Sequence, residues 1–216
     1  MRVIAAVFAL TFFLVACADD QQAPAKKSAE YKAGTHYVVL DKPVRTADPN
    51  KIEVTEIFWY GCGHCFRFDP VLHQWAEKLP ADVDFKLSPA MWGGNMELHA
   101  RAFYTAKALN VLDKLHQPLF NALNLENKPL ASEAELANFF AQHGVDKATF
   151  SKTFNSFGVV SQVKQADARA RSYQIGGTPE MVVEGKYRVS GGMAGGQQKM
   201  LDVVDFLIAK TRAERD

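Results

Sequence analysis

Residues 52–65 read IEVTEIFWYGCGHC, and this stretch decides what kind of fold the chain can form. Its first part, residues 52–60, is rich in β-branched and aromatic side chains and predicts a strand. After it, apolar residues recur at steps of three and four, which predicts a helix with one apolar face. These residues are Cys65, Phe68, Leu72, Trp75 and Leu79. A strand that leads directly into a helix places Cys62 at the helix N-terminus.

The predicted position of Cys62 has a chemical consequence. Backbone N–H groups and the positive end of the helix dipole favour an anion at a helix N-terminus, which lowers the pKa of a thiol there. We therefore expect Cys62 to be the attacking thiolate. Cys65 lies one turn further along, is expected to be less exposed, and suits the role of resolving thiol.

A metal site is one alternative use of this motif, because Cys62, His64 and Cys65 could all bind zinc or copper. A closed zinc site usually needs four ligands, and the sequence has no second cluster that could supply the fourth. The remaining histidines stand alone and are interpreted as ordinary surface or helix residues. They are His36, His73, His99, His116 and His143. The sequence therefore does not favour a metal role.

A structural disulfide is the other alternative. A disulfide stabilises a protein by closing a loop in the unfolded chain, and the effect grows with loop length. The loop between Cys62 and Cys65 is very short. A purely structural bridge there would contribute little, so a redox-active pair is the preferred interpretation.

Strand periodicity draws attention to Glu56. Because side chains alternate across a strand, Glu56 shares a face with Ile52, Val54 and Phe58. Burial among apolar residues would raise the pKa of the carboxyl group and make it a proton acceptor or donor as thiols and disulfide interconvert. The alternative is an edge strand with Glu56 facing solvent. The functional interpretation is preferred, because a buried, unpaired carboxylate is energetically costly and therefore tends to mark a functional site.

Composition and charge exclude some classes of function. The chain has 216 residues, 48% of them hydrophobic and 23% charged, as is usual for a globular protein. Its formal net charge is +1, and its basic residues are scattered among acidic ones. Nucleic-acid binding is therefore not expected.

The N-terminus predicts export. Residues 3–16 form an apolar run that is interrupted only by Thr11. A helix needs about 20 apolar residues to span a bilayer, so this run is too short for that and suits the core of a signal peptide. Residues 14–17 read LVAC and resemble a bacterial lipobox. On this basis we expect residues 1–16 to be a lipoprotein signal peptide and Cys17 to carry the lipid.

Export and lipidation together predict the protein's location. Residues 17–30 are expected to be a lipidated, flexible tether, with the folded part starting near Tyr31. The expected location is the periplasm, anchored to a membrane. Thiols can be oxidised in such a compartment. Once Cys17 is assigned to lipid, Cys62 and Cys65 are the remaining thiols and are expected to pair with each other.

Two motifs together carry a resemblance to a known family. The sequences EIFWYGCGHC at 56–65 and GTPEM at 177–181 resemble the DsbA family of bacterial thiol:disulfide oxidoreductases, within the thioredoxin superfamily. The resemblance spans roughly residues 37–209. It implies an α/β thioredoxin fold with an inserted helical domain. It also implies that the Thr178–Pro179 bond is cis and lies beside Cys62, whereas local sequence alone favours a trans bond.

The rest of the chain fits this architecture. We expect residues 31–92 and 159–216 to form the thioredoxin-like domain and residues 93–158 the inserted helical domain. Further predicted elements are a strand at 83–87, a break at 91–94, helices between 95 and 157 with a capping box at 132–135 and a stop at 143–144, a helix at 159–175, a hairpin turning at 184–185, and a helix at 197–209. Pro70 is expected to kink the helix that follows Cys62 rather than to end it.

Two positions depart from the family pattern. Members of the family often have Pro-His between the cysteines, whereas this chain has Gly63-His64. His64 is expected to favour the Cys62 thiolate by its charge or by hydrogen bonding, but Gly63 leaves the redox potential open. Lys86 lies where the family can place a lysine near the buried acid, yet strand alternation directs it to the opposite face.

The resemblance implies a protein that introduces disulfide bonds into exported, reduced and unfolded proteins. It also implies a membrane partner, a quinone-linked reoxidase of the DsbB type, and no bound cofactor; we expect the chain to act as a monomer. Two alternatives stay open. One is a disulfide isomerase or reductase, and the other is a non-redox chaperone or metallochaperone on a thioredoxin scaffold.

Overall fold

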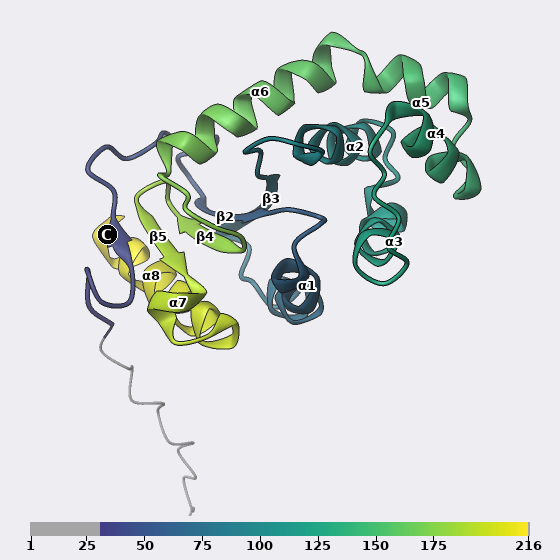
Figure 1. The fold of residues 1–216 in the computed structure, drawn as a ribbon. Coiled ribbons are helices and arrows are strands. Elements are labelled where there is room, and N and C mark those ends of the chain that lie inside the picture. The colour runs from purple at the N-terminus through teal and green to yellow at the C-terminus, as the bar shows by residue number, and fades with distance from the viewer. Residues whose placement is uncertain (1–30, 216) are drawn as a thin grey trace, which may run out of the picture.

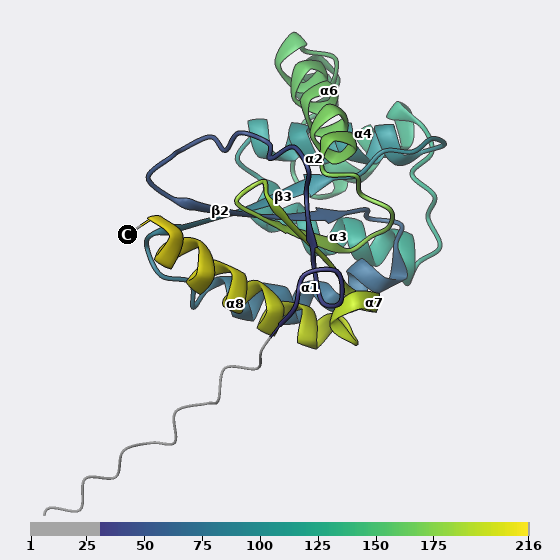
Figure 2. The same ribbon diagram turned by 90° about the vertical axis from the view of Figure 1, so that its left-hand side faces the viewer.

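The computed structural model describes residues 31–215, which build a five-stranded sheet between two layers of helices (Figures 1 and 2). The strand order is β1-β5-β4-β2-β3. Strands β2 and β3 are parallel, and the other neighbouring pairs are antiparallel. The strands are β1 Val38–Val39, β2 Ile52–Phe58, β3 Val83–Pro89, β4 Glu180–Val183 and β5 Tyr187–Ser190.

Helices cover both faces of the sheet. Helices α1 and α8 pack against one face, with the short α7 beside them, and α6 crosses the other face on its way back from a bundle formed by α2 to α5 (Figure 1). The helices are α1 Gly63–Ala76, α2 Met96–Ala108, α3 Leu112–Asn124, α4 Glu133–Gln142, α5 Lys147–Phe154, α6 Phe157–Ser172, α7 Gly191–Ala194 and α8 Gln197–Arg215.

Strand β2 is an interior strand of the sheet, and all seven of its residues are buried. Ile52 and Val54 belong to the apolar core under α1 and α8, whereas Ile57 packs in a separate core under α6. Glu56 therefore lies on the α1 face, as the alternation predicted. The alternative of an edge strand with Glu56 in solvent is wrong, because β3 and β4 flank β2 on both sides.

The predicted elements are present, with shifted ends. Strand β2 stops at Phe58, two residues early, because the chain turns where the Cys62 N–H donates to the Trp59 carbonyl. Helix α1 continues through Pro70, and α8 extends to Arg215. The predicted capping box is confirmed, since the Glu135 N–H donates to the Ser132 hydroxyl.

Helix α6 ends at Ser172, three residues before the predicted end. Gln174 adopts the left-handed conformation, with a φ of 54°. This turn lets the Ile175 N–H donate back to the Ala170 carbonyl. A left-handed residue after a helix closes the last turn in this way, so the helix stops before the predicted Gly176 boundary.

The predicted hairpin between β4 and β5 turns at Glu184-Gly185, and both residues have positive φ values, 55° and 58°. Glycine is required at 185 for a second reason, because a side-chain carbon there would overlap the Val44 carbonyl. The Val44 N–H donates to the Gly185 carbonyl at 2.9 Å. The hairpin thus fastens the segment that leads into β2.

The predictions for the N-terminus lie outside the described residues. These are the signal peptide at 1–16, the tether at 17–30 and the lipidated Cys17. Within residues 31–215, every helix is too short or too polar to cross a bilayer.

Candidate active site

Cys62 and Cys65 lie at the start of α1, just beyond the end of β2. Cys62 is the N-cap residue, with extended backbone angles, and the first helical hydrogen bond runs from the Phe66 N–H to the Cys62 carbonyl. Cys62 is half-buried, whereas Cys65 is fully buried. Both are free thiols. Their exposures match the predicted order, with Cys62 the accessible sulfur and Cys65 the protected one.

The surroundings of Cys62 lower the pKa of its thiol from 9.0 to about 5. The largest cause is the hydrogen bond from the Cys65 thiol. Burial opposes it, and the Thr178 side chain and the backbone N–H groups of Cys65 and His64 add to the lowering. The helix-terminus effect predicted from sequence is thus present, but as a secondary contribution. At neutral pH, Cys62 is a thiolate.

The pKa values of the two thiols are shifted in opposite directions. Burial raises the pKa of Cys65 far above its usual value, and its hydrogen bond to Cys62 and the charge of Glu56 raise it further. Cys65 therefore keeps its proton while Cys62 gives up its own. Such a division suits a dithiol in which one sulfur reacts with partners and the other closes the disulfide.

The Thr178–Pro179 loop lies against Cys62. In its protonated state the Cys62 thiol donates to the Thr178 carbonyl at 3.3 Å, and the Thr178–Pro179 peptide bond is cis. A groove of about 470 Å³ opens beside this loop and reaches His64 and Gln197. The Gln197 side chain donates to the His64 carbonyl at 2.8 Å and so joins α8 to the start of α1. The loop and groove, far from Cys62 in sequence, form one surface with it.

Glu56 is buried below the cysteines, with 3% of its surface exposed. Burial raises the pKa of its carboxyl well above 4.5, and the charges of Asp69 and Cys62 raise it further. The charge of Glu56 in turn raises the pKa of Cys65. A carboxylic acid coupled to the buried thiol is the arrangement expected of a proton donor and acceptor for that thiol.

A second polar cluster beside Glu56 was not anticipated from the sequence. The two nitrogens of the His116 ring bridge the Tyr60 hydroxyl at 2.7 Å and an Asp69 carboxylate oxygen at 3.1 Å. His116 lies on α3, so the helical insertion supplies a residue to the active site. The sequence predicted only an ordinary surface or helix residue. Its helical position is confirmed, but its side chain is largely buried and has two polar partners.

The turn that carries Cys62 is held from two further directions. The Trp59 indole N–H donates to Nδ1 of His99 at 3.0 Å, and the other His99 nitrogen donates to the Pro129 carbonyl at 3.1 Å. Burial lowers the pKa of His99, which keeps the neutral ring that this arrangement needs. Gly61 packs against the Trp59 ring so closely that a side-chain carbon would overlap it. A lone histidine on a helix gave no sequence signal for this contact.

His64 lies beside Cys62, whereas Lys86 lies on the sheet face away from the thiols. The His64 ring is paired with Arg67, 3.1 Å from its guanidinium, and the backbone of His64 is the part that lowers the Cys62 pKa. Lys86 lies 2.5 Å from Glu53 and 3.0 Å from Asp84. It faces away from Glu56, as strand alternation predicted.

Comparison with known proteins identifies one family throughout. The family model described as a DSBA-like thioredoxin domain matches residues 71–207. The thiol:disulfide interchange protein DsbA of Pseudomonas aeruginosa is 46% identical over 189 residues, covering 88% of this chain and 90% of its own length, and that of Azotobacter vinelandii is 46% identical over 192 residues, covering 89% and 90%.

Solved structures agree with the sequence comparison. The crystal structure of Pseudomonas aeruginosa DsbA superposes with a TM-score of 0.83 at 46% identity, over 86% of this chain and 96% of that one. The crystal structure of the oxidoreductase DsbA from Xylella fastidiosa gives a TM-score of 0.80 at 35% identity, over 85% and 98%. The match extends over the sheet and the helical insertion alike.

The Cys65 thiol is expected to set the acidity of Cys62. In the reduced protein, Cys62 should titrate near pH 5, as measured by the ultraviolet absorbance of the thiolate. C65A removes the hydrogen-bond donor and should raise the midpoint by at least about one pH unit, whereas C65S keeps a donor and should raise it less. An unchanged midpoint in C65A would mean that the helix N-terminus and Thr178 control the pKa instead.

Glu56 should make stability depend on pH in a defined direction. Its pKa is raised on folding, so the folded state resists ionisation, and wild-type stability should fall as pH rises above 4.5 toward the folded-state pKa. E56Q cannot ionise and should gain stability relative to wild type over that range, with little difference below it. Denaturant unfolding of the oxidised proteins measures this without cysteine titration. If the free energies of unfolding of E56Q and wild type differ by the same amount at every pH, the proposed effect of burial on the Glu56 pKa is contradicted.

Proposed function

Because the chain belongs to the DsbA family of thiol:disulfide interchange proteins, we propose that its Cys62–Cys65 disulfide oxidises exported proteins that arrive reduced and unfolded. The fold is a thioredoxin fold with an inserted helical region, as in the DsbA structures. The observation that carries the proposal is the difference between the two sulfurs, since Cys62 is half-exposed with a pKa lowered to about 5 and Cys65 is buried with a raised pKa.

The first chemical step follows from exposure. A substrate thiolate attacks Sγ of Cys62, the sulfur that solvent can reach, and the Cys62–Cys65 bond breaks as a mixed disulfide forms. Cys65 leaves with the electron pair and takes up a proton, as its raised pKa requires. Protonated Glu56 is the proposed source of that proton, because its own pKa is raised and it is coupled to Cys65.

The second step depends on the leaving group. A second substrate thiolate attacks the substrate sulfur of the mixed disulfide, which forms the substrate disulfide and expels Cys62 as a thiolate. A thiol with a pKa of about 5 is a good leaving group at neutral pH. Two electrons thus pass from the substrate to the enzyme, which ends with both cysteines reduced.

The acidity of Cys62 also favours an oxidising role. A lowered thiol pKa stabilises the reduced protein at pH values above the ordinary thiol pKa of 9.0, and that stabilisation is lost as pH falls through about 5. About half of it is present at neutral pH, which lies midway between the two pKa values. A stabilised reduced form makes the disulfide form a better electron acceptor.

Binding and regeneration complete the proposal. The groove beside Thr178 and Pro179 is the proposed place for an extended substrate segment, whose backbone could pair with this loop. Each turnover leaves the pair reduced, so a membrane oxidant is needed, and a quinone-linked partner of the DsbB type is the proposed one.

The proposal also assigns the site residues and the domains. The site residues are Cys62, Cys65, Glu56, His64, Thr178 and Pro179. Residues 31–92 and 159–216 form the proposed thioredoxin-like domain, and residues 93–158 form the proposed insertion.

The lipid anchor is a further part of the proposal. It is supported by the apolar run at 3–16 and the LVAC sequence that ends at Cys17. An anchored periplasmic enzyme would stay near a membrane-bound oxidant, which raises the local concentration of each for the other.

The oxidase function can be tested with the purified disulfide form and a reduced, unfolded protein. We expect stoichiometric substrate oxidation, complete loss with C62S, and a pair trapped mainly oxidised in cells. A pair found mainly reduced in cells would instead favour an isomerase or reductase. A C62A variant that still assists substrates lacking cysteine would favour a chaperone.

The anchor can be tested separately in cells. C17S removes the proposed lipid attachment site, and we expect the protein to move from the membrane fraction to the soluble periplasmic fraction. C62S, which leaves Cys17 in place, is the control and should stay with the membrane. Mass spectrometry of the mature N-terminus reports the modification directly, and an unmodified N-terminus in the wild-type protein would contradict the anchor.

A further inference from the structure

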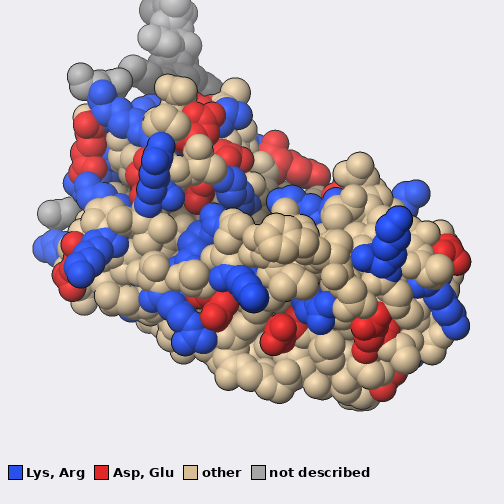
Figure 3. Space-filling model, turned by 90° about the horizontal axis from the view of Figure 1, so that it is seen from above, with Lys and Arg blue, Asp and Glu red and all other residues tan. Residues whose placement is uncertain are grey.

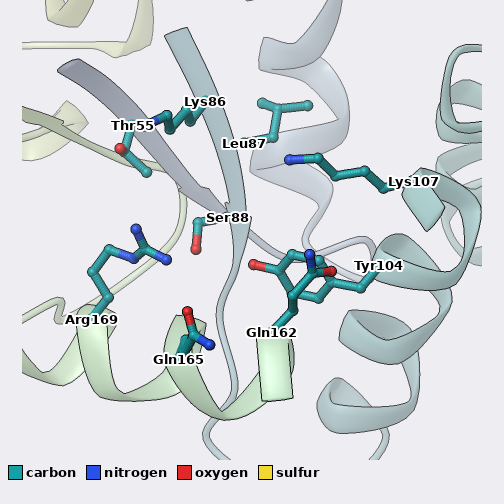
Figure 4. A pocket seen from close by; sticks show the side chains of 9 residues that line it. All are labelled: Thr55, Lys86, Leu87, Ser88, Tyr104, Lys107, Gln162, Gln165 and Arg169. Carbon is teal, nitrogen blue, oxygen red and sulfur yellow. The ribbon is translucent and has the colours of Figure 1, made fainter. Parts of the chain in front are cut away.

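A polar cavity lies on the sheet face opposite Glu56, away from the reactive sulfur (Figure 4). It is bounded by β2 and β3 on one side and by α2 and α6 on the others. Its lining residues are Thr55, Lys86, Leu87, Ser88, Tyr104, Lys107, Gln162, Gln165 and Arg169. The cavity has a volume of about 210 Å³, which is below the roughly 300–1,000 Å³ of pockets for drug-sized molecules. Its size suits a small ligand or one small group of a larger ligand.

The charges around this cavity are unbalanced. Lys86 is paired with Glu53 and Asp84, so its charge is compensated. Lys107 and Arg169 take part in no ion pair within residues 31–215. The lining contains no carboxylate. Two positive charges therefore face a cavity that offers them no partner from the described part of the chain.

A buried hydroxyl at the cavity floor also lacks a well-aligned partner within residues 31–215. Ser88 is 4% exposed, and its Oγ atom makes no well-aligned hydrogen bond there. The Tyr104 hydroxyl is its polar neighbour: burial raises the pKa of Tyr104, and the Ser88 hydroxyl lowers it in part. The Ser88 hydroxyl points into the space between Arg169 and the Tyr104 hydroxyl, which faces it from α2 (Figure 4). Buried polar atoms normally have a partner, because leaving one unpaired is costly. A ligand oxygen in the cavity would supply it.

We propose that this cavity binds the dianion of phosphate or of a phosphate monoester. Two uncompensated cations match two negative charges, whereas a monocarboxylate would leave one cation unbalanced. Ser88, Tyr104 and the side-chain amides of Gln162 and Gln165 offer further donors around the same space. Arginine is well suited to such an oxyanion because its planar fork donates two parallel hydrogen bonds.

The surface around the cavity argues against a nucleic-acid backbone as the ligand. On the face above α6, Lys and Arg side chains are interspersed with Asp and Glu rather than gathered into one basic area (Figure 3). A polymer of phosphates needs an extended positive surface. The charge imbalance here is local, so the cavity fits a single phosphate group. A bound phosphate would connect β3 with α2 and α6, which joins the sheet to the helical insertion.

Titration with inorganic phosphate at constant ionic strength tests the proposal. Saturable shifts of amide signals from β3, α2 and α6 are expected in heteronuclear NMR spectra, with a matching rise in thermal stability. R169Q and K107Q should each weaken binding about tenfold, since a charge-assisted hydrogen bond is lost. K164Q removes the same charge from an exposed position on α6 that does not line the cavity, and it should bind as wild type does.

Further variants separate binding from folding and from thiol chemistry. S88A should weaken binding but keep the fold, as judged by circular dichroism. Thiol oxidation by R169Q should equal that of wild type, because Arg169 lies outside the thiol site. Shifts that do not saturate, or that are equal in wild type and R169Q, would overturn the proposal.

The source of the phosphate group can be resolved with two more probes. Glycerol 3-phosphate presents a free monoester, and vesicles containing phosphatidic acid present the same group on a membrane, with phosphatidylcholine vesicles as the neutral control. C17S protein is used so that no lipid anchor contributes. Binding of the free monoester alone identifies a soluble ligand, and binding of both identifies a headgroup site. Binding of none of the probes, inorganic phosphate included, refutes the cavity's role.

Discussion

The stabilisation of one sulfur anion at the start of α1 is the constraint on which the rest of the active site depends. Cys62 loses its proton near pH 5 because Cys65 donates to it, aided by the Thr178 side chain and the first backbone N–H groups of the helix. Each of these donors must be held within hydrogen-bond distance. The interior strand β2, the loop before β4 and helix α1 have to meet at one point to provide them.

Several long-range contacts keep that meeting point in place. Gln197 of α8 bonds the His64 carbonyl, and Asn124 of α3 donates to the Tyr60 carbonyl at 2.8 Å, just before the cysteines. His99 of α2 holds Trp59, against which Gly61 packs. The helical insertion is therefore a structural support for the turn before Cys62 as well as a cover for the sheet. Glu56 and the Tyr60–His116–Asp69 cluster add buried polar groups that cost stability unless they are satisfied, and the surrounding aromatic core offsets that cost.

The two faces of β2 serve different purposes. On the α1 face, Glu56 is coupled to the thiols, and burial raises the pKa of its carboxyl group well above 4.5. On the α6 face, Glu53 is paired with Lys86, and the neighbouring cavity is lined by Lys107 and Arg169, which form no ion pair within residues 31–215. Because side chains alternate along a strand, one buried strand can supply both environments without mixing their charges.

The sequence by itself determined the local features of this protein. Periodicity predicted β2, α1, the hairpin at Glu184-Gly185 and the face of Glu56, because such patterns depend on residues close together in the chain. The CGHC spacing and its place after a strand predicted which cysteine would react. The resemblance supplied the cis bond before Pro179, which local sequence argued against.

Only the tertiary structure decided which distant side chains meet. His116 and His99 gave no signal beyond a helical position, yet both are bound within the active-site region by partners about 40 to 56 residues away. Likewise, the buried Ser88 hydroxyl and the charges of Lys107 and Arg169, which form no ion pair within residues 31–215, are brought together only when β3, α2 and α6 are assembled. The physical reason is that hydrogen-bond partners and burial are properties of three-dimensional packing, and a single sequence records only the order of residues.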